Sequence, residues 1–167
     1  MASTDHRSGG TDQEKDAQKI RFERQIALAA SLGKPLIIHC RNAHDDMLTI
    51  LTTARAQYGD KLSIIIHFFT ATGEIAQRYI DIGCYLSFPG PITYTAMYDD
   101  SIRIAPVDKI LAETDSPFAA PVPYRGKRNE PVYVAEVVRK LALVRGEDVE
   151  TLRAQILENT QRVFQLT

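Results

Sequence analysis

The sequence predicts a single α/β domain in which parallel strands alternate with helices. Four short apolar runs rich in β-branched residues begin at about Pro35, Leu62, Cys84 and Lys109, and helical patterns lie between them. Strands that are apolar on both faces belong in a buried parallel sheet, and the intervening helices complete βα units. Of the 167 residues, 44% are hydrophobic, which is enough for one core but not for two comfortable ones.

Composition narrows the class of protein further. The net charge is −1, so any contact with nucleic acid has to come from a local basic patch. No apolar run approaches the ~18 residues of a membrane span, and the polar start lacks the apolar core of a signal peptide. Cys40 and Cys84 are the only cysteines, which gives no disulfide framework and favours a reducing compartment. We therefore expect a cytoplasmic protein that does not contact a membrane.

The first part of the chain predicts a loop, a helix, a strand and a second helix. Residues 1–14 are polar without apolar periodicity, so a loop is expected there. Apolar residues recur at helical spacing over 15–32, where a glycine and a proline end the helix. A strand at 35–40 follows, and Asn42 is expected to cap a second helix that ends near Gly59.

The remaining elements alternate in the same way. In order, they are a strand at 62–68, a helix at 73–81, a strand at 84–88, a looser helix at 96–105 and a strand at 108–115. Three helices are expected at the end, near 130–144, 148–157 and 159–165. No internal repeat indicates a solenoid.

Three of the four predicted strands end in a side chain that can bind a metal, namely His39, His67 and Asp115. Active sites of parallel α/β folds lie beyond the carboxyl ends of the strands, so these residues are expected to converge. Two imidazoles and a carboxylate suit Zn²⁺ or Mn²⁺. Glu113 points to the same side as Asp115 and could orient a ligand. Taken singly, each residue could instead be a packing or turn residue; three at matched positions favour a metal site.

Other ligand-type residues have less support. His6 lies in the polar start, and His44 begins a helix beside two aspartates. Cys40 follows His39 directly and so points to the opposite face, which favours a place in the core.

A basic segment, residues 118–131, follows the last predicted strand. It contains three cations, Arg125, Lys127 and Arg128. Next to Asp115 they could hold phosphate oxygens, and the ring of Tyr124 offers a surface on which a base can stack. Arg41, just past His39, is a further candidate for phosphate binding. The alternative for all of these is a solvated basic turn.

Several motifs together resemble the TatD family of metal-dependent deoxyribonucleases. They run in the family's order from about Phe22 to the C-terminus, and they are GKPLIIHCRNAHDD, HFFTATGE, GCYLSFPGPITY, ILAETDSPFAAPVPYRGKRNEP and ENTQRVF. The resemblance implies a (β/α)₈ TIM barrel of the amidohydrolase type that hydrolyses DNA, single-stranded or at its ends, with divalent Mg, Mn or Zn. Residues 15–167 would supply about strands five to eight with their helices, and 1–14 the remnant of the preceding loop.

The resemblance also assigns roles to individual residues. His39 matches the metal ligand after the fifth strand, His67 the ligand after the sixth, and Asp115 the metal-bound acid after the eighth. Asp115 is then also the general base. Phe68 stands where the family usually has Cys, and it is expected to face away from the metals.

Two features of the family are missing from the sequence. No His-x-His motif is present, and the bridging Glu of the family's fourth strand has no counterpart. The resemblance therefore implies a weakened deoxyribonuclease. The alternatives are an inactive truncated relative that binds DNA or a complementing N-terminal chain, a homodimer that hides exposed strand edges, and a metallohydrolase of the same architecture with another substrate.

Overall fold

The computed structural model describes residues 2–5 and 11–166. Residues 6–10, and with them His6, lie outside this part. The chain divides into two compact units, Met1–His67 and Phe68–Thr167, which are taken in turn. Among the helices of the described residues, none is both long enough and apolar enough to cross a bilayer.

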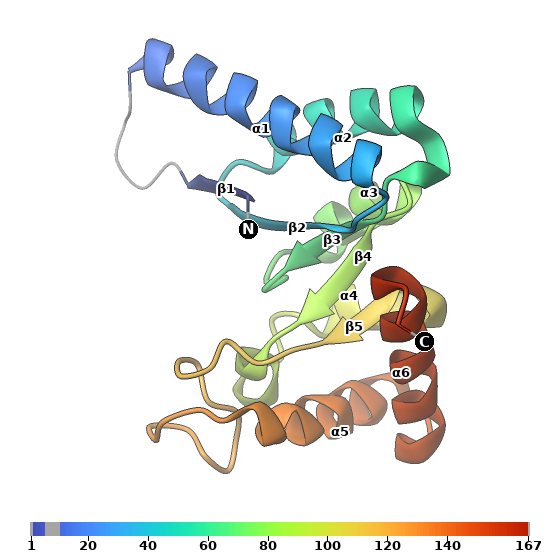
Figure 1. Ribbon diagram of the computed structural model, residues 1–167. Helices are drawn as coiled ribbons and strands as arrows, with labels where there is room; N and C mark the ends of the chain where they lie inside the picture. The colour runs from blue at the N-terminus through green and yellow to red at the C-terminus, as the bar shows by residue number, and fades with distance from the viewer. Residues whose placement is uncertain (1, 6–10, 167) are drawn as a thin grey trace. The chain divides into compact units, whose positions relative to one another are not determined.

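Unit 1 contains three parallel strands and two long helices (Figure 1). Strand β2 (Leu36–Arg41) pairs with β1 (Ala2–Asp5) on one side and with β3 (Ile64–His67) on the other. The centre of this sheet is apolar, with Ile38 and Ile64 fully buried. The predicted parallel α/β arrangement is therefore confirmed in this unit.

Helix α1 (Asp12–Leu32) begins earlier than predicted. The side chain of Thr11 accepts a hydrogen bond from the backbone N–H of Glu14, whose carboxylate in turn accepts from the N–H of Thr11. This capping box satisfies two N–H groups at the helix start, so the polar residues before position 15 are helical. The helix ends at Gly33, which adopts the left-handed conformation as predicted.

The prediction that Asn42 caps the second helix is wrong. Helix α2 (His44–Tyr58) has Ala43 at its N-cap, without a side-chain hydrogen bond. Asn42 has φ = 58°, a left-handed conformation, whereas an N-cap residue usually has extended backbone angles. Asn42 instead provides the tight turn between β2 and α2, a role that asparagine tolerates better than most residues. Gly59 ends the helix, as predicted.

A loop was also predicted at the start of the chain, where the structure has strand β1. The register pairs Ala2 with Ile38 and Asp5 with Arg41. A parallel ladder is made by backbone hydrogen bonds, so a polar segment can join it without any apolar pattern. This strand is additional to the four predicted ones.

Unit 2 contains strands β4 (Tyr85–Phe88) and β5 (Ile110–Ala112), which pair in parallel. Its helices are α3 (Gly73–Asp81), α4 (Asp99–Ile104), α5 (Val134–Arg145) and α6 (Val149–Phe164). Short 3₁₀ helices include η2 (Gly90–Tyr94) and η3 (Val107–Lys109). The core of this unit joins the two strands to the inner faces of α5 and α6, through Leu86, Ile110, Val137, Leu141 and Leu152.

The end of the chain differs from prediction in two places. The helices expected at 148–157 and 159–165 are one continuous helix, α6. Asn159, which the prediction placed at the start of the second of these helices, is fully buried inside α6 and donates to the carbonyls of Val107 and Ile110 at 2.8 and 2.9 Å. Helix α5 begins later than position 130 because Pro131–Tyr133 forms a 3₁₀ turn first.

Candidate metal centre and basic loop

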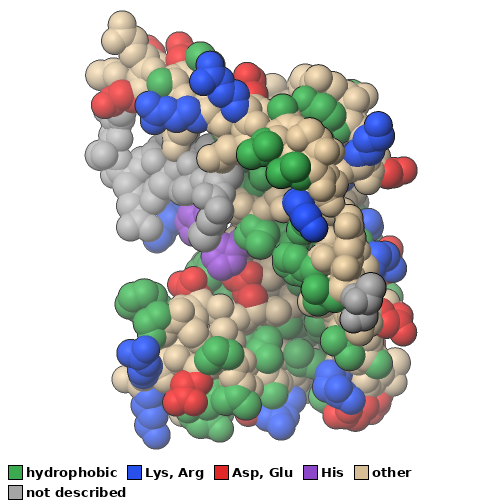
Figure 2. All heavy atoms as spheres, in the orientation of Figure 1, with side chains coloured by type: hydrophobic (Ala, Val, Ile, Leu, Met, Phe, Trp, Pro, Cys, Tyr) green, Lys and Arg blue, Asp and Glu red, His purple; other side chains and the backbone are tan. Residues whose placement is uncertain are grey.

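His39 and His67 lie side by side at the carboxyl ends of β2 and β3. The register pairs them directly, and their ring centroids are 6.0 Å apart with the planes tilted by 51°. Figure 2 shows histidine side chains, in purple, next to one another on this face of the molecule. Because parallel strands carry directly paired residues on the same face, the sequence positions alone bring these two rings together.

The pair is suited to a divalent cation. Neutral imidazole is a common ligand of Zn²⁺ and of related transition metals. The two rings lie on adjacent strands with their centroids 6.0 Å apart, so each can offer one nitrogen to a shared ion. Unit 1 therefore offers two nitrogen ligands for a metal ion, which is part of a complete ligand set.

The two predicted carboxylates lie in unit 2. Asp115 follows β5 by three residues, and its backbone carbonyl accepts the N–H of Phe118 at 2.7 Å. Among the described residues, no group of three or more His, Cys, Asp and Glu side chains is close enough to hold a metal. The structure thus brings the histidines together in one unit and places the carboxylates in the other.

Glu113 is hydrogen-bonded to several segments of unit 2. Its carboxylate accepts a hydrogen bond from the backbone N–H of Phe68 at 2.9 Å and one from the buried hydroxyl of Ser87 at 2.5 Å. The N–H of Glu113 itself donates to the carbonyl of Phe88. The sequence did not point to Ser87, because a lone serine inside an apolar strand carries no distinctive signal.

Cys40 and His44 have a contact of their own. The Sγ of Cys40 lies 3.5 Å from Nδ1 of His44, on the first turn of α2. Cys40 is half-buried rather than fully in the core.

The basic loop, residues 118–131, lies between β5 and α5 and contains tight turns. The N–H of Lys127 donates to the carbonyl of Tyr124 at 3.0 Å, and Gly126, the third residue of this turn, has φ = 86°. A positive φ at that position defines a type II turn and favours glycine. The turn exposes the three predicted cations, Arg125, Lys127 and Arg128. Arg41 is also exposed, in unit 1.

Two side chains of this turn rest on aromatic rings. Tyr124 is stacked on Tyr133, with centroids 3.7 Å apart and planes within 3° of parallel. The guanidinium carbon of Arg125 lies 4.1 Å from the centroid of the Tyr94 ring. One face of Tyr124, the predicted stacking residue, is therefore covered by Tyr133. Tyr94 and Tyr133 also belong to this candidate site, and the sequence did not predict them.

The N-terminal part of the basic loop packs against η2. A Cβ added to Gly90 would lie 2.3 Å from the carbonyl oxygen of Ala119, so only glycine allows this close approach. The hydroxyl of Thr93 accepts the N–H of Val122 at 2.9 Å and donates to the carbonyl of Gly90 at 2.8 Å. The loop is thus fastened to η2 by hydrogen bonds and close packing.

The electrostatics of the stacked pair favour a neutral phenol. The pKa of Tyr133 is raised above its ordinary value, first by desolvation, then by the nearby carboxylate of Glu130 and by Tyr124. Tyr133 therefore stays protonated at neutral pH and adds no negative charge beside the cations.

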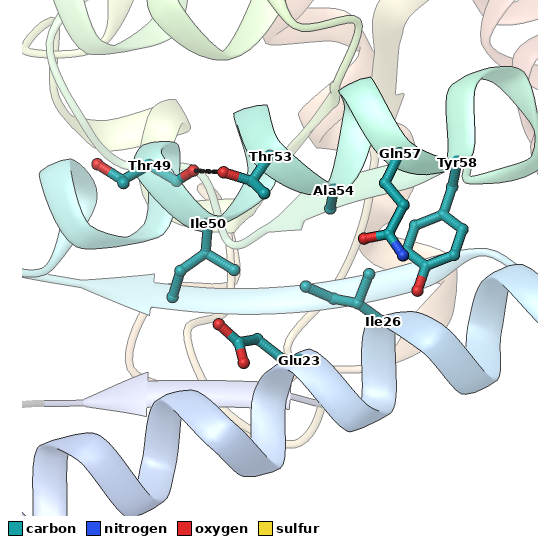
Figure 3. A pocket seen from close by; sticks show the side chains of 8 residues that line it. All are labelled: Glu23, Ile26, Thr49, Ile50, Thr53, Ala54, Gln57 and Tyr58. Atoms are coloured by element: carbon teal, nitrogen blue, oxygen red, sulfur yellow. Dashed lines mark hydrogen bonds between the residues drawn. The ribbon is translucent and has the colours of Figure 1, made fainter.

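A groove of about 390 Å³ lies in unit 1, away from the strand ends, between α1 and α2 (Figure 3). It is lined by Glu23, Ile26, Thr49, Ile50, Thr53, Ala54, Gln57 and Tyr58. Its lining has one carboxylate and no histidine, cysteine or cation, so it offers neither a set of metal ligands nor a phosphate site.

Comparison with known proteins gives a consistent match. A family model described as "TatD related DNase" matches residues 5–165. The chain is 38% identical over 154 residues to an uncharacterized metal-dependent hydrolase, YabD, of Bacillus subtilis, covering 91% of this chain and 59% of that protein. It is 33% identical over 156 residues to a protein of Enterobacter lignolyticus named 3′-5′ ssDNA/RNA exonuclease TatD, covering 89% and 58%. The chain thus spans less than two thirds of these relatives.

Solved structures share the fold. A TatD homologue from Escherichia coli, YJJV, superposes with a TM-score of 0.86 at 25% identity, over 100% of this chain and 63% of that one. A hydrolase of Entamoeba histolytica gives a TM-score of 0.82 at 15% identity, over 99% and 62%. The second likeness is one of fold alone.

Proposed function

The chain belongs to the TatD related DNase family, and from that premise we propose that it is a metal-dependent deoxyribonuclease, which hydrolyses phosphodiester bonds in single-stranded DNA or at DNA ends. The observation that supports this most is the direct pairing of His39 with His67 at the ends of adjacent strands. The resemblance of the chain to named metal-dependent hydrolases and exonucleases supports it further.

In this proposal His39, His67 and Asp115 hold one divalent ion, Mg²⁺, Mn²⁺ or Zn²⁺. The chemistry that such an ion supplies when bound is polarisation of a phosphoryl oxygen and activation of water. Asp115 accepts the proton of the attacking water as general base. Glu113 orients the residues around it through Ser87 and the N–H of Phe68.

The substrate is held by the basic loop. Its exposed cations, Arg125, Lys127 and Arg128, neutralise phosphate oxygens, and Arg41 adds a positive charge at the end of β2. Tyr124 supports a base. The fold of the whole protein is proposed to be a TIM barrel of which residues 15–167 form about strands five to eight, and its compartment the cytoplasm.

Hydrolysis of end-labelled single-stranded DNA by the purified chain tests the proposal. We expect cleavage with Mg²⁺ or Mn²⁺, at a lower rate than that of a full-length relative, and none with EDTA. The Asp115→Asn variant should lose roughly 100-fold or more in kcat/KM, since it removes the base. Asp108→Asn, which changes an exposed carboxylate of η3, serves as the matched control. Equal rates for wild type and Asp115→Asn would contradict the proposal.

A second candidate function is binding without turnover. It is favoured by the described part of the chain, in which no three His, Cys, Asp and Glu side chains lie close enough together to hold a metal. In that case the chain binds DNA, or a chain that supplies the remaining ligands, but no metal gives cleavage. Restored hydrolysis on addition of the N-terminal part of a relative would identify the complementing chain.

A further inference from the structure

We propose that the basic loop recognises unpaired nucleobases through two ready-made stacking supports, Tyr124 backed by Tyr133 and Arg125 backed by Tyr94, while Lys127 and Arg128 contact the phosphates. This inference rests on the proposed function, and it names the part of the substrate that the basic loop contacts, which is the base. It also changes the role of Arg125 from a phosphate contact to a planar surface.

The first argument is geometric. The rings of Tyr124 and Tyr133 are stacked in parallel, and the guanidinium carbon of Arg125 lies over the Tyr94 ring. Aromatic rings and the guanidinium plane both stack on the faces of bases, so a base can extend either arrangement. Tyr124 is half-buried and Arg125 is exposed, so both side chains keep surface that a ligand can reach.

The second argument is rigidity. Tyr124 and Arg125 occupy the first two positions of the type II turn, and the N–H of Tyr124 donates to the carbonyl of Pro121 at 2.7 Å. Just beyond the turn, the buried side chain of Asn129 donates to the carbonyl of Phe118 at 2.7 Å. A support that is ordered beforehand loses little conformational entropy on binding.

The third argument is charge. Lys127 and Arg128 are exposed beside the two supports, whereas the nearby guanidinium of Arg139 is engaged by Glu136. Glu130 is the acidic neighbour of the stacked pair. Two exposed cations that flank flat surfaces suit a polyanion whose bases and phosphates alternate.

The fourth argument is exposed apolar surface around the loop. Phe118 is 70% exposed, Val122 44% and Val132 68%. Figure 2 shows hydrophobic and cationic side chains next to one another in this part of unit 2. Apolar groups exposed together and bordered by charge mark an interaction surface, and bases cover such groups better than a small phosphate ester does.

The test compares two oligonucleotides of equal length, a fluorescent deoxythymidine decamer and its abasic counterpart, which keeps every phosphate and lacks every base. Binding is measured by anisotropy in EDTA, so that no cleavage occurs. We expect Tyr124→Ala and Arg125→Ala each to weaken binding of the decamer roughly tenfold, the scale of one lost base stack. Binding of the abasic chain by Tyr124→Ala should change less than about twofold, because this variant removes a ring and no charge.

Lys127→Ala is the matched control for charge. This variant should weaken the binding of both oligonucleotides by the same factor, since it removes a phosphate contact. It should also lower the salt dependence of binding. Tyr124→Phe, which keeps the ring, should bind as wild type, and Tyr124→Leu, which keeps the bulk without the ring, should behave as Tyr124→Ala. Circular dichroism of each variant checks its fold.

The outcomes separate the two proposals. If Tyr124→Ala and Tyr124→Leu weaken both oligonucleotides equally, or neither, base recognition is overturned while the nuclease proposal stands. If the decamer binds in the expected pattern but is never cleaved with metal, the nuclease proposal fails and base recognition stands. If the wild-type chain binds neither oligonucleotide, both fail.

Discussion

At the scale of single residues, Gly90 determines where the basic loop can lie. Its backbone meets the carbonyl of Ala119 at a distance that leaves no room for a Cβ. The contact is with backbone, which cannot rotate away as the end of a flexible side chain can. The position of Tyr124 and Arg125 therefore depends on residue 90 having no side chain.

We expect Gly90→Ala to lower the free energy of unfolding by about 1–3 kcal/mol, because it forces the loop or η2 to shift. The variant should also bind the base-bearing decamer more weakly. Gly73→Ala is the control, since the nearest atom to its added Cβ is 3.4 Å away. Thermal unfolding measures both variants, and equal stability of the two would contradict the steric argument.

Residue-scale prediction from the sequence succeeded where position along a strand decides geometry. His39 and His67 were expected together and are in direct register. The sequence did not predict which rings Tyr124 and Arg125 stack on, because those rings come from η2 and from the turn before α5. Such pairings depend on tertiary structure, and no local spacing encodes them.

At the scale of elements, α6 is attached to β5 through one buried amide. Asn159 donates to the carbonyls of Val107 and Ile110, and its own carbonyl oxygen accepts from Arg162 at 2.8 Å. The prediction ended one helix at position 157 and began another at 159, whereas a single helix runs through this point and contacts the strand there.

Asn159→Ala should therefore cost about 2–4 kcal/mol of stability, because two buried carbonyls lose their donor. Leu157→Ala, on the same helix but at a side chain that is 51% exposed, provides the control and should cost far less. Chemical denaturation gives both values. A small loss for Asn159→Ala would mean that water replaces the amide.

The start of α6 depends on pH. The pKa of Asp148 is lowered by the backbone N–H of Thr151 first and by its hydroxyl second. A carboxylate whose pKa is depressed by folding stabilises the native state fully above its ordinary value of 3.8, and this contribution is lost as the pH falls through the depressed pKa. The loss of stability in Asp148→Ala should be equal at neutral and mildly acidic pH and should shrink below that value. A loss independent of pH would contradict capping by the charge.

At the scale of the whole molecule, α1 carries large apolar side chains on its surface. Ile20, Leu28 and Leu32 are 51%, 58% and 62% exposed. They are interspersed with the exposed side chains of Arg21 and Arg24, so the surface of this helix is mixed rather than apolar.

The parallel α/β class and each of the four predicted strands follow from apolar runs, and the structure has them. Strand β1 could not be predicted in this way, because its residues are polar and its place depends on the backbone of β2. Boundaries shifted where side chains cap helices, as at Thr11. The metal site itself stays a prediction, of which the structure shows only that His39 and His67 lie in direct register.

The register of β2 and β3 has a consequence for how this sequence can change in length. Removing one residue within Ile64–Ile66 would turn His67 to the opposite face of its strand, since side chains alternate. An insertion in the exposed turn around Asp60, between α2 and β3, leaves that pairing untouched. Insertions and deletions that keep the histidine pair should therefore be tolerated at such turns. An affinity tag or fluorophore placed there should leave the pair intact.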